Sequence, residues 1–144
     1  LGLQILMGSA VLILCTLVHV AVMAGGIPLI KRVAQRQHTR RPRLDITLIL
    51  SAGVMLIVLV HTLQVWGWAF AFHAVGAFED FASSFYFSMV TYTTLGYGDI
   101  VLGPGLRIFG TFAAITGLLA FGISTAFLIA MVVRLLPDSF QQTN

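Results

Sequence analysis

Hydrophobic residues form three long runs along the chain, separated by polar or charged segments. Residues 1–30 contain no Asp, Glu, Lys or Arg, and neither do residues 46–68 or residues 108–133. About 20 consecutive apolar residues are enough for a helix to cross the hydrocarbon core of a bilayer. The pattern therefore predicts three membrane-spanning helices.

A shorter apolar segment lies between the second and third runs. Residues 81–93 would form a helix of roughly 20 Å, which reaches only about halfway across a bilayer. Glu79 and Asp80 precede it, where carboxylates favour a helix N-terminus and an aspartate can act as the cap. We predict a re-entrant helix whose C-terminal end, with its partial negative charge, points toward the membrane centre and favours a cation there.

Glycine, proline and charged residues set the expected boundaries. Gly25, Gly26 and Pro28 should end or kink the first helix near the membrane edge. A cleaved signal peptide is the alternative for this run, but no basic region precedes it and it is long for a signal core. The expected elements, in chain order, are a helix at 1–30, a basic loop at 31–45, helices at 46–72, 81–93 and 105–136, and a polar tail at 137–144.

Basic residues are concentrated after the first helix. Six of the eight lie within thirteen positions: Lys31, Arg32, Arg36, Arg40, Arg41 and Arg43. The positive-inside rule predicts that this segment is cytoplasmic, so the N-terminus lies outside and the last helix ends inside at Arg134. Contact of the loop with anionic lipid is a secondary role. A nucleic-acid interface is the alternative, but no aromatic residue is interleaved, so no nucleic-acid partner is predicted. Trp66 and Trp68 predict an interfacial aromatic belt at the outer end of the second spanning helix.

The composition is typical of a membrane protein. Hydrophobic residues make up 58% of the 144 residues and charged residues 9%, whereas soluble domains contain about 25% charged residues. We predict an all-α membrane protein with one compact membrane domain. Cys15 is the single cysteine, which excludes an intrachain disulfide, and its expected role is packing. No acid–base pair, metal-ligand cluster or inverted repeat is evident, so neither an enzyme nor a carrier is predicted.

A seven-residue string follows the short apolar segment: Thr93-Thr94-Leu95-Gly96-Tyr97-Gly98-Asp99. A dehydrated cation needs a cage of oxygens, and backbone carbonyls supply rings of oxygens only if successive C=O groups point inward. Such a backbone alternates in handedness, and glycine reaches positive φ without a Cβ penalty. Gly96 and Gly98 have the spacing of two that this alternation needs.

The string closely resembles the selectivity filter of potassium channels, Thr-Val-Gly-Tyr-Gly-Asp, the standard example of a carbonyl-lined filter. The resemblance implies that K⁺ is bound by backbone oxygens of Thr94, Leu95, Gly96 and Tyr97, together with the Thr94 hydroxyl. It also implies that Thr93, Gly98 and Tyr86 support the filter and that Asp99 lies at its outer mouth. Leu95 and Tyr97 would point away from the ion. One filter copy per chain implies a homotetrameric pore, with K⁺ as the permeant ion and no cofactor.

The last long run carries a second resemblance. Residues 117–126 match the pattern Gly-x-x-x-Phe-Gly-x-x-Thr-Ala of the pore-lining helix in bacterial two-helix potassium channels. The matching region covers roughly residues 46–133 and leaves the first helix outside. The resemblance implies that Gly117 is a gating hinge, with close helix packing as the alternative. The inner pore would be lined by Leu118, Phe121, Gly122, Thr125, Ile129 and Val133.

The string departs from the family pattern at several positions. Leu95 replaces the commoner valine, and Val90 stands where some members have a glutamate that partners the filter aspartate. Tyr86 stands where a tryptophan is common, and its hydroxyl could donate a hydrogen bond to Asp99.

Two histidines lie within the predicted spans. His19 and His61 should lie at similar depths, since the first helix runs inward and the second outward. We expect an interhelical hydrogen bond; pH sensing by these histidines is the alternative.

The sequence as a whole predicts a potassium-selective channel of the cell membrane, which for this family implies the bacterial inner membrane. A weakly selective cation channel and a non-conducting accessory subunit are the alternatives. No helix carries arginines at every third position, so no voltage sensor of the usual kind is expected.

Overall fold

The computed structural model describes residues 1–36 and 42–135. Four α-helices make up the fold: α1 (Gly2–Arg36), α2 (Pro42–Ala74), α3 (Phe81–Tyr92) and α4 (Arg107–Leu135). Three of them contain segments long and apolar enough to cross a membrane, at Gly2–Arg32, Ile46–Ala74 and Arg107–Leu135. The predicted all-α membrane fold is thereby confirmed. The predicted tail at 137–144 and the middle of the basic loop lie outside the described residues.

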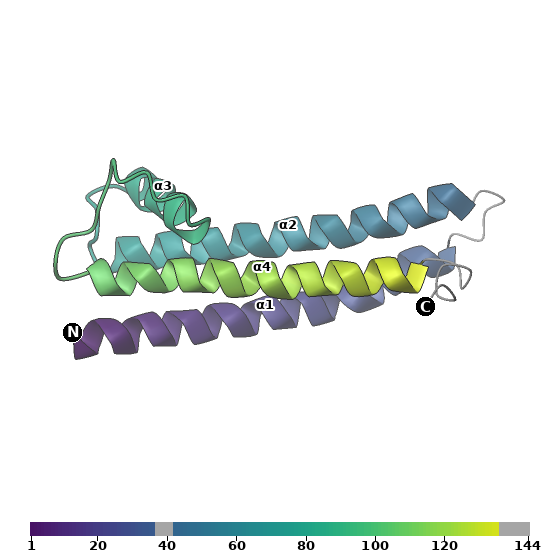
Figure 1. Cartoon of the computed structure of the whole chain (residues 1–144), viewed down its shortest axis with the longest axis horizontal. Helices are drawn as coiled ribbons and strands as arrows, with labels where there is room; N and C mark the ends of the chain where they lie inside the picture. The colour runs from purple at the N-terminus through teal and green to yellow at the C-terminus, as the bar shows by residue number, and fades with distance from the viewer. Residues whose placement is uncertain (37–41, 136–144) are drawn as a thin grey trace, which may run out of the picture.

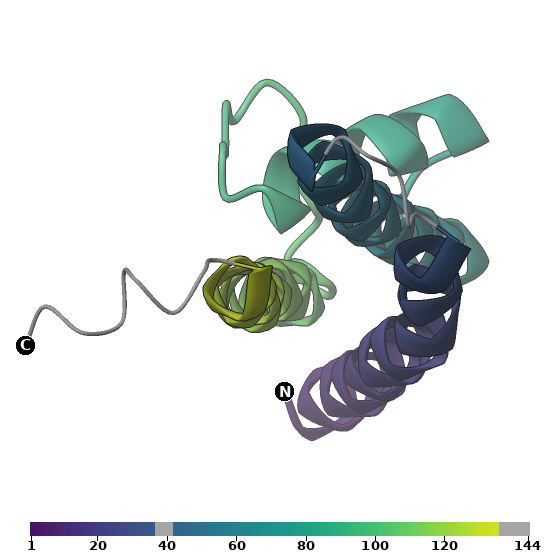
Figure 2. The same ribbon diagram turned by 90° about the vertical axis from the view of Figure 1, so that its right-hand side faces the viewer.

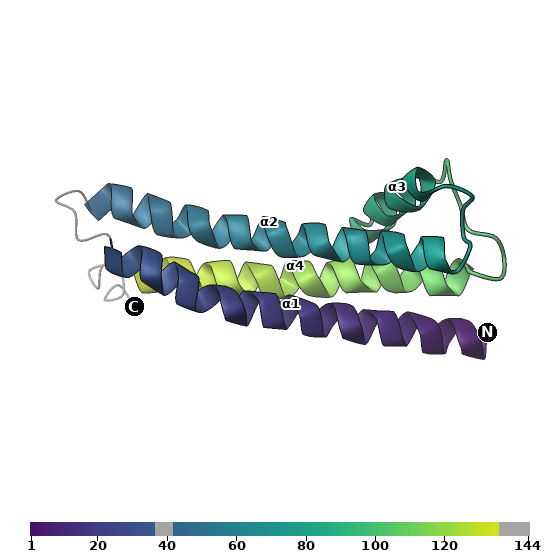
Figure 3. The same cartoon turned by 180° about the vertical axis from the view of Figure 1, so that it is seen from behind.

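The three long helices lie side by side, and α3 is inclined to them at the end that holds the N-terminus (Figures 1 and 3). We call this the filter end, because residues 93–99 lie there. The opposite end, called the basic end, holds the C-terminus of α1, the start of α2 and the end of α4 (Figure 1). Viewed from the basic end, α1 and α3 lie on opposite sides of the α2–α4 pair (Figure 2).

Helix α1 continues beyond its expected end at residue 30. It includes Pro28 and ends at Arg36, and α2 already begins at Pro42. The expected loop at 31–45 is therefore helical at both of its ends. Membrane helices tolerate proline where neighbouring helices support the backbone. Gly26 lies directly against the side chain of Leu56 in α2, and α1 bends in this part of its length (Figure 3).

The core at the filter end is aromatic. Trp68, Phe72, Tyr92 and Phe109 are almost fully buried, and the ring centroids of Trp68 and Phe109 lie 5.5 Å apart. The expectation that Trp68 belongs to an interfacial belt is therefore wrong, whereas Trp66 is 43% exposed. Residues two apart on a helix point about 200° away from each other, so one tryptophan faces the core and the other faces outward.

Candidate functional site

Helix α3 is capped as its sequence predicts. Asp80 has an extended backbone and accepts a hydrogen bond of 2.8 Å from the Ser83 backbone N–H. Ser83 Oγ donates a second bond of 2.7 Å to the same carboxylate. The hydroxyl bond is the main cause that holds the pKa of Asp80 below its usual value, and the backbone bond adds to it. The helix ends at Tyr92, and Thr93 is its C-cap.

Two contacts hold α3 against the long helices. Ser88, which is fully buried, donates a hydrogen bond of 2.7 Å from Oγ to the carbonyl oxygen of Val65 in α2. On the other side, the carbonyl oxygen of Tyr92 lies directly against Gly117 of α4, so closely that a Cβ atom there would overlap it. Gly117 lies roughly 15 Å along α4 from Arg107. The C-terminal end of α3 therefore reaches about halfway along the thickness of a bilayer core.

The backbone after α3 alternates in handedness. The φ angle is 59° at Thr94, 58° at Gly96 and 78° at Gly98, while Leu95 and Tyr97 between them have negative φ. This is the alternation expected from the glycine spacing, and Thr94 extends it by one step. A β-branched residue with positive φ is a conformational outlier. Such strain persists only where the surroundings enforce it, and it clusters at functional sites.

Hydrogen bonds from the filter segment run back to α3. The carbonyl oxygen of Val90 accepts from the N–H groups of both Leu95 and Gly96, at 2.9 Å and 3.2 Å, and Thr94 N–H donates to Thr91 O at 3.0 Å. Within the described residues, no hydrogen bond is made to the carbonyl oxygens of residues 94–97. The segment therefore has anchored donors and free acceptors, the combination that a cation ligand requires.

Tyr86 and Asp99 form the hydrogen bond that was expected in place of the family's usual partners. The Tyr86 hydroxyl donates to Asp99 Oδ2 at 2.6 Å. This bond is the main cause that holds the pKa of Asp99 below its usual value and raises the pKa of Tyr86. It joins the middle of α3 to the end of the filter segment.

Two apolar side chains of the filter segment are largely exposed. Leu95 is 54% exposed and Tyr97 is 69% exposed. Both side chains were expected to point away from the ion, so contacts beyond this single chain would be needed to support them there.

Helix α4 has two different faces. The face toward α1, α2 and α3 is buried and includes Gly117, Ala120 and Ser124. The predicted inner-pore residues lie largely on the opposite face, where Leu118 is 62% exposed and Ile129 58%. The full set of predicted inner-pore residues is exposed in the single chain: Leu118, Phe121, Gly122, Thr125, Ile129 and Val133.

Gly117 and Gly122 differ in their surroundings. Gly117 lies on the buried face against Tyr92, whereas no atom lies within 4 Å of a Cβ placed at Gly122. The contact supports the close-packing interpretation of Gly117, and its role as a hinge stays a prediction.

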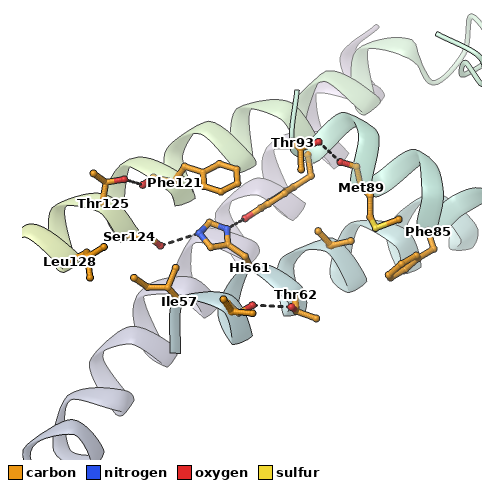
Figure 4. A pocket seen from close by; sticks show the side chains of 13 residues that line it. Ile57, His61, Thr62, Phe85, Met89, Thr93, Phe121, Ser124, Thr125 and Leu128 are labelled. Atoms are coloured by element: carbon orange, nitrogen blue, oxygen red, sulfur yellow. Dashed lines mark hydrogen bonds between the residues drawn. The ribbon is translucent and has the colours of Figure 1, made fainter. Parts of the chain in front are cut away.

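His61 connects three helices beneath the filter segment (Figure 4). Its Nδ1 lies 2.8 Å from the Tyr92 hydroxyl, and its Nε2 lies 3.1 Å from Ser124 Oγ. Ser124 Oγ also lies 3.3 Å from Nε2 of His19 in α1. The expected interhelical hydrogen bonding of the two histidines is confirmed. Ser124 was not anticipated, because a serine in a helix carries no local signal for such a partner.

A crevice of about 480 Å³ opens beside His61. It is lined by residues of α2, α3 and α4, with Thr93 at the α3 end and Thr125 on α4 (Figure 4). Its walls are mainly apolar, so the histidine is the main polar group on its α2 side.

The model of the Ion_trans_2 family, described as an ion channel, matches residues 46–134. The chain belongs to this ion-channel family. The comparisons with curated proteins and with solved structures found no match.

In this ion channel the matched region contains α3, the filter segment and nearly all of α2 and α4. The resemblance stated from the filter and inner-helix motifs is thereby confirmed. Helix α1 lies outside the match, as predicted, yet it is part of the packed core through His19 and Cys15.

Proposed function

We propose that this channel conducts K⁺ selectively through a filter made by residues 93–99 of four identical chains. The carbonyl oxygens of Thr94, Leu95, Gly96 and Tyr97 would hold the ions, with the Thr94 hydroxyl at the inner end. The observation that carries the proposal is the alternating backbone of this segment, with positive φ at Thr94, Gly96 and Gly98. A backbone of this kind directs successive carbonyls to one side, where they replace the hydration shell of the ion.

Two electrostatic features support a cation path. The C-terminal end of α3 carries a partial negative charge of about half a unit, and it lies at Thr93, directly before the filter segment. At the opposite end of the segment, Asp99 stays ionised to lower pH than an ordinary carboxylate because Tyr86 holds its pKa down. A permeating ion would therefore meet negative potential on both sides of the filter.

The exposed side chains favour a tetramer. Leu95, Tyr97 and the outer face of α4 are apolar surfaces at the proposed ion path, and one filter segment cannot enclose an ion. Four copies around one axis would bury them and complete the oxygen rings. Flow would be passive and would involve no catalysed reaction. The basic end would be cytoplasmic and the N-terminus outside, in the bacterial inner membrane.

Flux from liposomes tests the proposal. Purified protein reconstituted with K⁺ inside should take up radioactive rubidium, and barium should block the uptake. Reversal potentials in mixed K⁺ and Na⁺ should follow the K⁺ gradient. A reversal potential that ignores this gradient would indicate a weakly selective cation channel. No uptake by a correctly folded, tetrameric protein would indicate an accessory subunit.

A further inference from the structure

A second crevice lies at the basic end, far from the filter segment. It has a volume of about 360 Å³ and is bounded by α1, the start of α2 and the end of α4. Its walls are apolar and include Ile27 of α1, Ile49 of α2 and Phe127 of α4. This volume is within the range of ordinary ligand sites, about 300–1,000 Å³.

Two cationic side chains line the same crevice from different helices. Lys31 projects from α1 and Arg134 from α4, and both residues are exposed. Neither has an ion-pair partner among the residues that the structure describes. Both lie next to the ends of the apolar spans, where a bilayer has its headgroups. An apolar wall below a pair of free cations matches a molecule with an acyl chain and a phosphate.

We propose that this crevice binds one anionic phospholipid of the cytoplasmic leaflet. Its phosphate would lie between Lys31 and Arg134, and an acyl chain would follow Ile27 and Phe127 into the crevice. Charge complementarity favours this occupant, because a lysine and an arginine that face solvent at a membrane surface attract anionic headgroups.

The proposal gives a role to α1, which lies outside the region that the family match covers. The match begins at residue 46, so one wall of the crevice and one of its two cations come from the additional helix. Arg134 directly follows Val133, one of the residues predicted to line the inner pore. A bound lipid would thus link α1 to the part of α4 that must move if the gate opens. The site depends on the membrane orientation and is independent of ion selectivity.

Lipid retention tests the site without any measurement of flux. The purified chain would be incubated with phosphatidylglycerol or phosphatidylcholine in detergent, and bound lipid counted by native mass spectrometry. We expect Lys31→Gln and Arg134→Gln each to weaken phosphatidylglycerol binding about fivefold, the effect of one cation near a lipid surface. Arg32→Gln is the matched control, because it removes the same charge from an exposed neighbour that does not line the crevice.

A second variant tests whether lipid retention depends on the space in the crevice or only on the surface charge. Ala130 lines the crevice and is exposed, so Ala130→Phe should fill the space and reduce retention while all charges remain. Melting temperatures and gel filtration would show that each variant is folded and assembled. Equal losses in Arg32→Gln and Lys31→Gln would overturn the proposal in favour of diffuse attraction. Unchanged retention in Ala130→Phe, or full displacement of the lipid by inorganic phosphate, would also overturn it.

Discussion

The carbonyl oxygen of Tyr92 fills the space that a Cβ atom at Gly117 would need. This contact joins the end of α3 to the middle of α4, so the filter segment and the inner helix share one support. Any side chain at position 117 must displace the C-terminal end of α3, from which the filter segment begins. Close packing therefore explains the glycine without a hinge.

Gly117→Ala should destabilise the channel by about 1–3 kcal/mol, the usual cost of overpacking a well-packed site. Its flux should fall because α3 is displaced. Gly122→Ala is the control, since no atom lies within 4 Å of its Cβ position and alanine favours a helix by about 1 kcal/mol over glycine. Thermal unfolding of both variants measures the effect. A Gly117→Ala protein of wild-type stability but altered gating would instead identify a hinge.

Tyr86→Phe should raise the pKa of Asp99, because the hydroxyl bond is the main cause of its lowered value. A carboxylate with a lowered pKa contributes stability above its ordinary pKa and loses it as the pH falls through the lowered value. In the variant this contribution should be smaller, and its loss should be complete at a higher pH. Carbon NMR of the Asp99 carboxyl group follows the titration directly.

Ser83→Ala is the matched control for Tyr86→Phe. It removes a hydroxyl donor from another exposed carboxylate, Asp80, and should shift that titration and leave Asp99 unchanged. An Asp99 titration that is the same in wild type and Tyr86→Phe would show that the 2.6 Å contact does not persist in solution.

Much of the local structure at the site could be predicted from sequence, because its causes are local. The Asp80 cap follows from the residue type before an apolar run, and the backbone alternation follows from the spacing of Gly96 and Gly98. The partnership of Tyr86 with Asp99 followed from one hydroxyl and one carboxylate at positions that the family resemblance brings together.

The remaining features depend on contacts between segments far apart in the chain. Trp68 and Trp66 have the same local signal, and only packing against other segments, such as Phe109 of α4, distinguishes the buried Trp68 from the exposed Trp66. Gly25, Gly26 and Pro28 indicated an end or a kink, and α1 bends in this part of its length but continues to Arg36. The positive φ at Thr94 was also missed, since a β-branched residue disfavours it and tertiary support overrides that preference.

Gly96→Ala tests whether the alternating backbone carries selectivity. Alanine at positive φ costs about 1–2 kcal/mol, so the segment should relax and misplace its carbonyl oxygens, with loss of K⁺ over Na⁺ selectivity. Gly76→Ala is the matched control, because Gly76 has a φ of 67° and lies outside the filter segment, and a Cβ at either position meets no atom within 4 Å. Reversal potentials compare the two. If both variants changed selectivity equally, backbone strain alone would be responsible, and the position of Gly96 in the filter segment would not matter.

The hydrogen-bonded chain from His19 through Ser124 and His61 to Tyr92 predicts that proton binding affects conduction. His61 meets Tyr92 from α3, His19 from α1 and the uncharged Ser124 from α4. The two histidine rings lie 5.5 Å apart, so two positive rings would repel and we expect the pair to take up one proton. A protonated His61 must donate to both Tyr92 and Ser124, which turns both hydroxyls into acceptors.

Flux should therefore change between about pH 5 and pH 8, the range in which histidine commonly titrates. His61→Ala should abolish this dependence, and His19→Ala should shift or reduce it. Ser124→Ala retains both histidines but removes the hydroxyl between them. The contributions of His19 and His61 to the pH response should then become independent of each other. Rubidium uptake across this pH range measures the response. If the wild-type response is preserved in His19→Ala and in His61→Ala, the histidines serve only to join the helices.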